Sequence, residues 1–191
     1  MKRSTCLPFL LFLLTLAAAC GTSEQGDQAE TPAPAAESPQ TAYGSVADVE
    51  TYLQAINPLV MEHNTLLSKY QEVLASGRDD SRNRVATEDN LAAQAAEVKP
   101  SLEALLTEFD AVEPPPLLAP FHRDVRKMFV KRIESMTKTM AGWEAKQAGN
   151  ESDSIYRDAE ATYEEANQIT LQLNTHMQRI NASMEQAVAT P

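Results

Sequence analysis

The chain has 191 residues, of which 43% are apolar and 23% are charged, and its formal net charge at pH 7 is −11. An acidic surface is repelled by nucleic acid and by anionic lipid headgroups, so the composition argues against a nucleic-acid-binding protein. For the same reason the body of the protein gains nothing from lying on a membrane.

Residues 1–19 have the pattern of a secretory signal peptide. Lys2 and Arg3 supply a positive start, and an apolar run from Leu7 to Ala19 follows and ends on small residues. This run is too short to cross a hydrocarbon core of ~30 Å, which needs about 20 residues of helix. We therefore expect it to be removed, and loss of Lys2 and Arg3 takes the formal charge from −11 to −13.

The apolar run ends in Leu16-Ala17-Ala18-Ala19-Cys20, which resembles the lipobox of bacterial prolipoproteins. The usual lipobox has leucine three residues before the cysteine, whereas here Leu16 lies one residue further back. The resemblance implies cleavage before Cys20, a diacylglyceryl thioether on its sulfur and acylation of the new amino group. Two acyl chains give stable membrane attachment, whereas one gives only marginal binding. Cys6 leaves with the signal, so the mature chain keeps one cysteine and forms no internal disulfide.

The residue after the cysteine indicates in which membrane the protein is anchored. The sorting rule of Gram-negative lipoproteins takes Asp at this position as an inner-membrane retention signal, so Gly21 favours the outer membrane. The alternative is an ordinary signal peptide followed by chance by a cysteine, in which case Cys20 is a free thiol.

Residues 20–44 have the composition of a tether. The stretch GTSEQGDQAETPAPAAESPQTAYG contains almost no large apolar side chains, so it cannot bury enough surface to offset the entropy of ordering. We expect it to be disordered, with a mean span of about 25 to 30 Å and a taut reach of about 80 Å.

Residues 45–191 show apolar side chains at helical spacing in four segments, and no segment alternates as a strand would. The first opens at the capping pair Ser45 and Asp48 and is expected to stop at Gly77. The second carries its stripe from Leu91 to Val112, and the third from Leu118 to Trp143, after Pro114 to Pro116. The fourth carries its stripe from Ala159 to Ala187, after a boundary at Gly149 and Asn150.

The predicted fold is all-α, an antiparallel up-down four-helix bundle with coiled-coil-like packing, because the connections are short. Pro58 and Pro100 lie inside the first two segments, between stripe positions, so each can face solvent and kink its helix. The alternative is that one or both helices break there, which gives five or six shorter helices. The residues expected to be buried are Leu53, Leu67, Leu105, Phe121, Met136, Leu173 and Ile180.

The third segment is basic and its neighbours are acidic. Its cations are Arg123, Arg126, Lys127, Lys131, Arg132 and Lys138. Two interpretations are possible. The cations form weak, exposed ion pairs with the neighbouring helices and so set the register of the helices, or they form a docking strip for an acidic partner.

The sequence contains few residues that could catalyse a reaction or bind a cofactor. The sequence has no CxxCH, HExxH or GxSxG motif, no glycine-rich phosphate loop, and no glutamate three residues before any histidine, as a di-iron bundle would need. His63 is the one polar residue on its stripe, and with His122, His176 and several methionines it suggests a haem or copper site. The other interpretation is a core histidine that hydrogen-bonds a neighbouring helix, with methionine as core filler.

The most distinctive stretch of the body is AVEPPPLLAPFHRDV. It resembles the proline-rich hinge, followed by a helix with an early histidine, of small bacterial helical lipoproteins. That resemblance implies no activity. Three consecutive prolines predict a stiff, extended corner, and Pro120 is tolerated in the first turn of the next helix.

Together these features predict a lipid-anchored, acidic, all-α module at a bacterial envelope, without a cofactor and without catalytic activity, that binds a protein partner. The first alternative is a haem- or copper-binding bundle that uses His63 and methionines. The second is an enzyme, against which the sequence shows no convergent set of acid, base and nucleophile.

Overall fold

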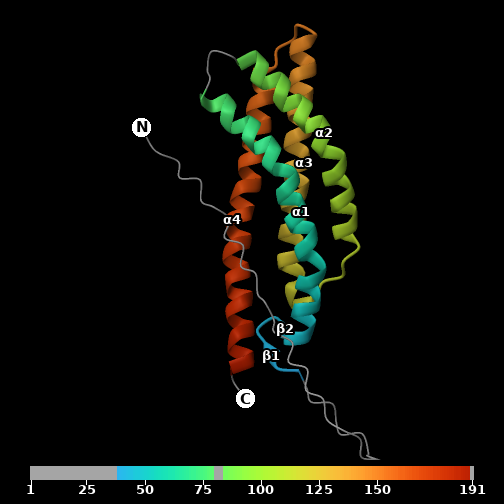
Figure 1. Ribbon diagram of the computed structural model, residues 1–191, viewed down its shortest axis with the longest axis vertical. Helices are drawn as coiled ribbons and strands as arrows, with labels where there is room; N and C mark the ends of the chain where they lie inside the picture. The colour runs from blue at the N-terminus through green and yellow to red at the C-terminus, as the bar shows by residue number, and fades with distance from the viewer. Residues whose placement is uncertain (1–37, 80–83, 190–191) are drawn as a thin grey trace, which may run out of the picture. The chain divides into compact units, whose positions relative to one another are not determined.

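The computed structural model describes residues 38–79 and 84–189. In this part of the chain the fold is all-α, as predicted, with four long helices and one very short sheet (Figure 1). The elements are β1 (Gln40–Thr41), β2 (Gly44–Ser45), α1 (Val46–Asp79), α2 (Arg84–Asp110), the 3-10 turn η1 (Pro116–Leu118), α3 (Ala119–Gln147) and α4 (Asp153–Ala189). The predicted signal peptide, Cys20 and the tether as far as residue 37 lie outside the described residues.

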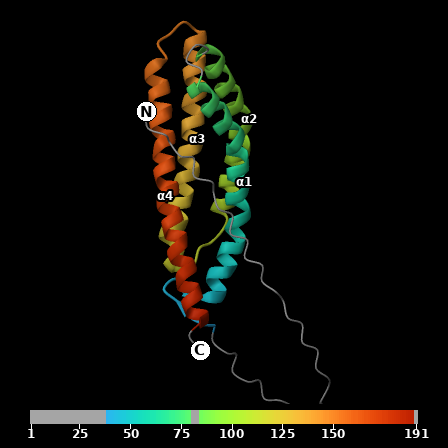
Figure 2. The same ribbon diagram turned by 60° about the vertical axis from the view of Figure 1, so that its left-hand side comes forward.

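Helices that follow one another in the chain pack against one another. α1 contacts α2, α2 contacts α3, and α3 contacts α4, and the two views in Figures 1 and 2 agree on this neighbourhood. The two strands connect the first helix to the last one, because β1 packs on α4 and β2 packs on α1.

The start of α1 differs from the sequence prediction. Residues 38–44, which the sequence assigned to a disordered tether, form an antiparallel hairpin in which Gln40 pairs with Ser45 and Thr41 with Gly44. Gly44 has φ +118°, a conformation that side chains disfavour, so glycine suits this turn. Composition alone missed the hairpin because its order comes from contacts made elsewhere, chiefly a hydrogen bond of 2.9 Å from the Ala42 N–H to the Ser183 Oγ of α4.

The same segment caps α1. The first N–H groups of a helix have no partner inside it. In α1 the Val46 N–H donates to the Pro39 carbonyl at 2.8 Å, and the Asp48 N–H donates to Ser45 Oγ at 3.1 Å. The Ser45 hydroxyl in turn donates to Asp48 Oδ2 at 2.7 Å, which confirms the predicted capping pair.

The two helical prolines do not break their helices. Pro58 lies within α1 and Pro100 within α2, both are exposed, and both helices change direction along their length in Figure 1. The prediction of four helices is therefore confirmed. The predicted stop at Gly77 is wrong, since α1 continues to Asp79.

The corners around α3 follow local chemistry. Pro115 has φ −54° and ψ 146°, the extended conformation expected for consecutive prolines, and Pro120 lies in the first turn of α3. At the other end Gly149 has φ +72°, its N–H donates to the Lys146 carbonyl, and the Asn150 N–H donates to the Ala145 carbonyl. This pair of hydrogen bonds is the Schellman motif, which explains why α3 ends at the predicted boundary.

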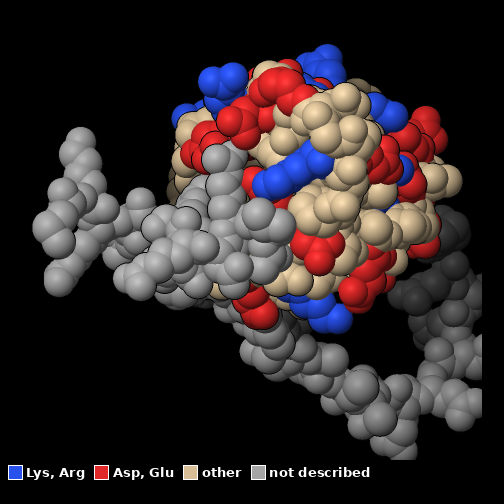
Figure 3. Space-filling model, turned by 90° about the horizontal axis from the view of Figure 1, so that it is seen from above, with Lys and Arg blue, Asp and Glu red and all other residues tan. Residues whose placement is uncertain are grey.

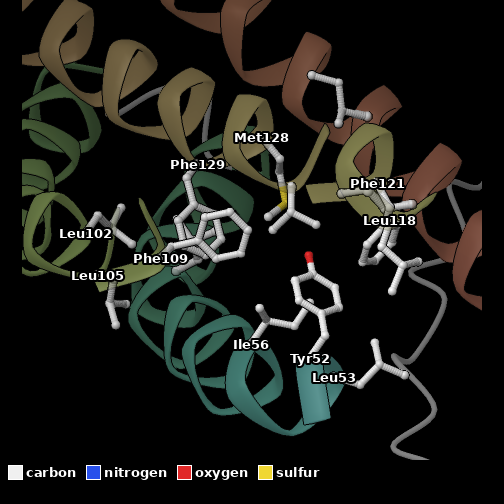
Figure 4. Close-up of a cluster of buried hydrophobic side chains, with 14 of the residues drawn as sticks. Tyr52, Leu53, Ile56, Leu102, Leu105, Phe109, Leu118, Phe121, Met128 and Phe129 are labelled. Atoms are coloured by element: carbon white, nitrogen blue, oxygen red, sulfur yellow. The ribbon is translucent and has the colours of Figure 1, made fainter. Parts of the chain in front are cut away.

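The core lies along the facing sides of the helices. All seven residues predicted to be buried are buried. Figure 4 shows how side chains of α1, α2, η1 and α3 converge: Phe109 and Phe129 lie next to each other, and Tyr52 and Ile56 approach from α1. This packing holds the three histidines in different settings.

Candidate functional site

The three histidines proposed as cofactor ligands lie in separate surroundings. His63 is on α1, His122 at the start of α3 and His176 on α4, and each ring contacts a different pair of aromatic or polar neighbours. Across residues 38–79 and 84–189, no group of three or more His, Cys, Asp or Glu side chains is placed to hold a metal ion. Of the methionines considered with them, Met61 is exposed, whereas Met128 and Met177 pack in or against the core.

His63 is a core residue, with 1% of its surface exposed. Its ring stacks on Phe129 with centroids 4.3 Å apart and planes 2° from parallel. Nδ1 lies 3.3 Å from Oδ1 of Asn64 on the same helix, while buried Nε2 has no hydrogen-bond partner in the described part of the chain. The expected bond to a neighbouring helix is therefore replaced by a bond within α1.

Burial controls the charge state of His63. Loss of solvation lowers its pKa from 6.5 to about 4, the hydrogen bond to Asn64 opposes this, and the positive charge of Arg132 adds to it. His63 is consequently a neutral imidazole at neutral pH. If the Asn64 amide oxygen accepts the proton of Nδ1, Nε2 is left as an unused acceptor.

His122 connects three helices at the proline-rich corner. Its ring stacks on Phe109 of α2 at 4.3 Å, and its Nδ1 lies 3.2 Å from the hydroxyl of Tyr52 on α1. Burial lowers the pKa of His122, the carboxylate of Asp110 raises it, and the nearby guanidinium of Arg126 lowers it. The imidazole thus ties α1 and α2 to the first turn of α3.

His176 is half-buried on α4, between the hairpin and α3. Its ring meets Phe121 edge-on at 5.3 Å and Tyr43 at 5.8 Å. It also lines a surface groove of about 300 Å³ between α3 and α4, together with Asp124, Gln172, Leu173, Thr175 and Arg179.

The buried polar cluster around Arg132 was not predicted from the sequence, in which Arg132 stands among the basic side chains of the third segment. Arg132 is 4% exposed, and its guanidinium lies 4.1 Å above the ring of Tyr163. One terminal nitrogen donates to the Tyr163 carbonyl at 3.3 Å and the other to Asn167 Oδ1 at 2.7 Å. The sequence did carry a signal, since Arg132 lies four residues from both Met128 and Met136 and therefore on the apolar stripe.

Further hydroxyl groups extend the polar layer between α3 and its neighbours. The Tyr70 hydroxyl of α1 lies 3.0 Å from Thr139 Oγ1, and Ser135 Oγ donates to the Ala159 carbonyl of α4 at 2.9 Å. Burial raises the pKa of Tyr70 and lowers that of Arg132, so the cluster keeps a neutral phenol beside a desolvated cation. These buried, directional bonds fix the register of α3 against α1 and α4.

Cations of α3 reach acidic residues on both flanking helices. Arg126 donates to Asp110 through Nε at 2.7 Å and through a terminal nitrogen at 2.9 Å, and Lys146 pairs with Glu88 of α2. On the other side Lys131 pairs with Glu165 of α4 at 2.9 Å. Arg123 and Lys127 are exposed. Seen from above in Figure 3, basic and acidic side chains are interspersed on the visible face and do not gather by sign.

None of the helices in residues 38–79 and 84–189 is both long enough and apolar enough to cross a membrane. Comparison of the chain with protein-family models, with curated proteins and with solved structures found no match.

Proposed function

We propose that this protein is a lipid-anchored, acidic, helical binding module of a bacterial envelope that works without catalysis. The observation that carries the proposal is the sequence Leu16-Ala17-Ala18-Ala19-Cys20 behind a positively charged, apolar signal. Cys20 is then the point of membrane attachment, and Gly21 favours the outer membrane in a Gram-negative host.

The body is, in this proposal, an antiparallel up-down four-helix bundle from about residue 45 to about residue 188. The packing of each helix on the next one in the chain supports this topology, as do the short connections. The ion pairs that join α3 to both α2 and α4 support the register interpretation of the basic helix rather than a docking strip.

The role of the body is binding rather than catalysis. His63 and His122 make packing and hydrogen-bonding contacts between or along helices, a structural use of these side chains. A tether between the anchor and the body leaves the surface of the body accessible to a protein partner in the envelope.

The experiment that tests this function is fractionation of the native host together with mass measurement of the N-terminal peptide. We expect the protein in the membrane fraction, with its chain beginning at Cys20 and carrying the mass of the acyl groups. Unmodified Cys20 on a freely soluble protein would contradict the proposal. Capture of envelope proteins on the wild-type chain then identifies the partner. The same capture on a variant with a changed surface charge shows whether that charge contributes to binding.

A further inference from the structure

A buried layer of side chains, called the His63 layer below, joins α1 to α3. It consists of His63 and Tyr70 from α1 and of Phe129, Arg132 and Thr139 from α3. The His63 ring stacks on Phe129 with centroids 4.3 Å apart, and Phe109 of α2 packs on the same phenylalanine at 5.4 Å. On α1 the neutral amide of Asn64 lies 3.3 Å from Nδ1 of His63. None of the ion pairs among the described residues involves His63, so an imidazolium here would have no carboxylate to pair with.

The His63 layer already holds one cation. The guanidinium of Arg132 lies over the ring of Tyr163 of α4, and it donates to the Tyr163 carbonyl and to Asn167 Oδ1, which are both neutral acceptors. Its positive charge acts on His63. The carboxylate that acts on Arg132 belongs to Glu164 of α4, which is exposed and accepts a hydrogen bond of 2.8 Å from the Asn167 amide. A proton on His63 would therefore place a second cation in a layer whose acceptors are neutral.

The middle of α1 is held in this layer by fewer bonds than α4 is. α3 and α4 are joined by hydrogen bonds and ion pairs of Arg132, Ser135, Lys131 and Lys138. Towards α1, the described part of the layer provides the His63 stack and one hydrogen bond, between the Tyr70 hydroxyl and Thr139 at 3.0 Å. The start of α1 is held separately, by the hairpin and by the bond between Tyr52 and His122. The middle of α1 is thus the part that can move away from α3.

We propose that the His63 layer is an acid-sensitive contact: a proton on His63 releases the middle of α1 from α3, while α3 and α4 remain packed together. A neutral imidazole can stay buried, whereas an imidazolium needs water or an anionic partner, and outward movement of α1 supplies water. Opening exposes the apolar rings of Phe129 and Phe109, so acid changes the surface that the protein offers to a partner. This response goes beyond the proposed function and does not depend on the lipid anchor.

The direction of the response follows from the two protonation equilibria. In the closed form burial lowers the pKa of His63 to about 4, and the Arg132 charge adds to this. In the opened form the imidazole has its ordinary pKa of about 6.5. Between these two values the opened form binds a proton that the closed form does not, so each pH unit of acidification favours opening by about tenfold.

The test is amide hydrogen exchange of the full chain at pH 7 and at pH 4.5, with each rate divided by its intrinsic rate. On acidification we expect the opening equilibrium of residues 59–70 to rise by about fiftyfold. At pH 4.5 these residues should exchange at least about tenfold faster than residues 128–139 of α3 and 162–173 of α4. Their exchange should also depend only weakly on added urea, because opening of one segment exposes little surface.

Substitutions then assign the response to His63. His63→Gln keeps a polar side chain but binds no proton in this range, so the rise in residues 59–70 should shrink to less than about threefold. His176→Gln is the matched control, since it removes a histidine outside the layer and should keep the full rise. Asn64→Asp places a carboxylate beside Nδ1, which gives the imidazolium a partner in the closed form, so the rise should also shrink.

Three results would overturn the acid-sensitive contact. The first is the same acid response of residues 59–70 in His63→Gln as in wild type. The second is exchange of these residues at the same rate, and with the same urea dependence, as in α3 and α4. The third is an NMR titration of the wild-type chain in which His63 gains its proton near its ordinary pKa while α1 stays protected. This titration uses the wild-type chain, so it decides the matter even where a variant does not fold.

Discussion

At the scale of single residues, His63 shows how a polar group in an apolar stripe is used. It forms a stacked contact with Phe129 but leaves its Nε2 buried without a partner in the described part of the chain. An unsatisfied buried polar atom costs about 1 to 3 kcal/mol. We therefore expect His63→Leu to leave the free energy of unfolding equal or higher at pH 7, measured by chemical denaturation.

The same substitution has a pH signature. Burial lowers the pKa of His63 to about 4, so between pH 6.5 and pH 4 the unfolded chain binds a proton that the folded chain does not. Stability therefore falls as the pH falls through this window, by up to about 3 kcal/mol from this group. The difference in unfolding free energy between His63→Leu and wild type should grow in favour of the variant on acidification. A haem or copper ion bound stoichiometrically to wild type and lost in His63→Leu would instead identify His63 as a ligand.

Leu105 tests the placement of the core. Its side chain is 3% exposed on α2, and it belongs to the same cluster as Leu102 and Phe109 (Figure 4). Leu105→Ala should lower the free energy of unfolding by about 2 to 5 kcal/mol, because the cavity adds to the lost transfer energy. A loss below about 1 kcal/mol would show that the α2 stripe is misplaced.

At the scale of helices, Gly142 of α3 lies directly against the ring of Tyr156 of α4. A Cβ built on Gly142 would lie 3.0 Å from Cε1 of the Tyr156 ring, which is tighter than ordinary contact. Replacing a helical glycine by alanine normally stabilises by up to about 1 kcal/mol. We expect Gly142→Ala to give no gain and to lower stability by about 1 kcal/mol, because the tyrosine ring must move.

The control for Gly142 is the same substitution in a chain that carries Tyr156→Ala. There the alanine methyl group has room, so Gly142→Ala should raise the free energy of unfolding, and the two backgrounds should differ by about 1 to 2 kcal/mol. If Gly142→Ala raises the free energy of unfolding by about 1 kcal/mol in the wild-type background, α3 and α4 do not approach as closely as they do in the structure.

The hairpin before α1 makes its own prediction at this scale. Two chains are compared, one beginning at Glu37 and one at Ser45, because residues 38–44 cap α1 and bond to Ser183 of α4. Both should be soluble, monomeric and largely helical, but the shorter chain should be less stable by about 1 to 3 kcal/mol. Amide exchange should be faster in the first turn of α1 and near Ser183, and equal rates in the two chains would contradict a role for the hairpin.

The sequence predicted most of the features that depend on local chemistry or on periodicity, with the stop at Gly77 as the exception, since α1 continues to Asp79. The capping pair at Ser45, the helix boundary at Gly149 and the buried stripe positions all follow from residue type and spacing. Features that depend on tertiary contact were missed. The hairpin is ordered by a hydrogen bond to a helix that lies more than a hundred residues away in sequence. The burial of Arg132 requires the ring of Tyr163 and the amide of Asn167, which no local pattern brings together.

At the scale of the whole molecule, attachment and folding are expected to be independent. Cys20 precedes the described helices by more than twenty residues, and the core is built from residues after Ser45. Cys20→Ser should therefore prevent lipidation and move the protein from the membrane fraction to the soluble fraction, while its helical circular dichroism and melting temperature match those of wild type. Cys6→Ser, in the predicted signal peptide, is the matched control and should change neither. A Cys20→Ser protein that stays in the membrane fraction would show that something other than an acylated thiol holds it there.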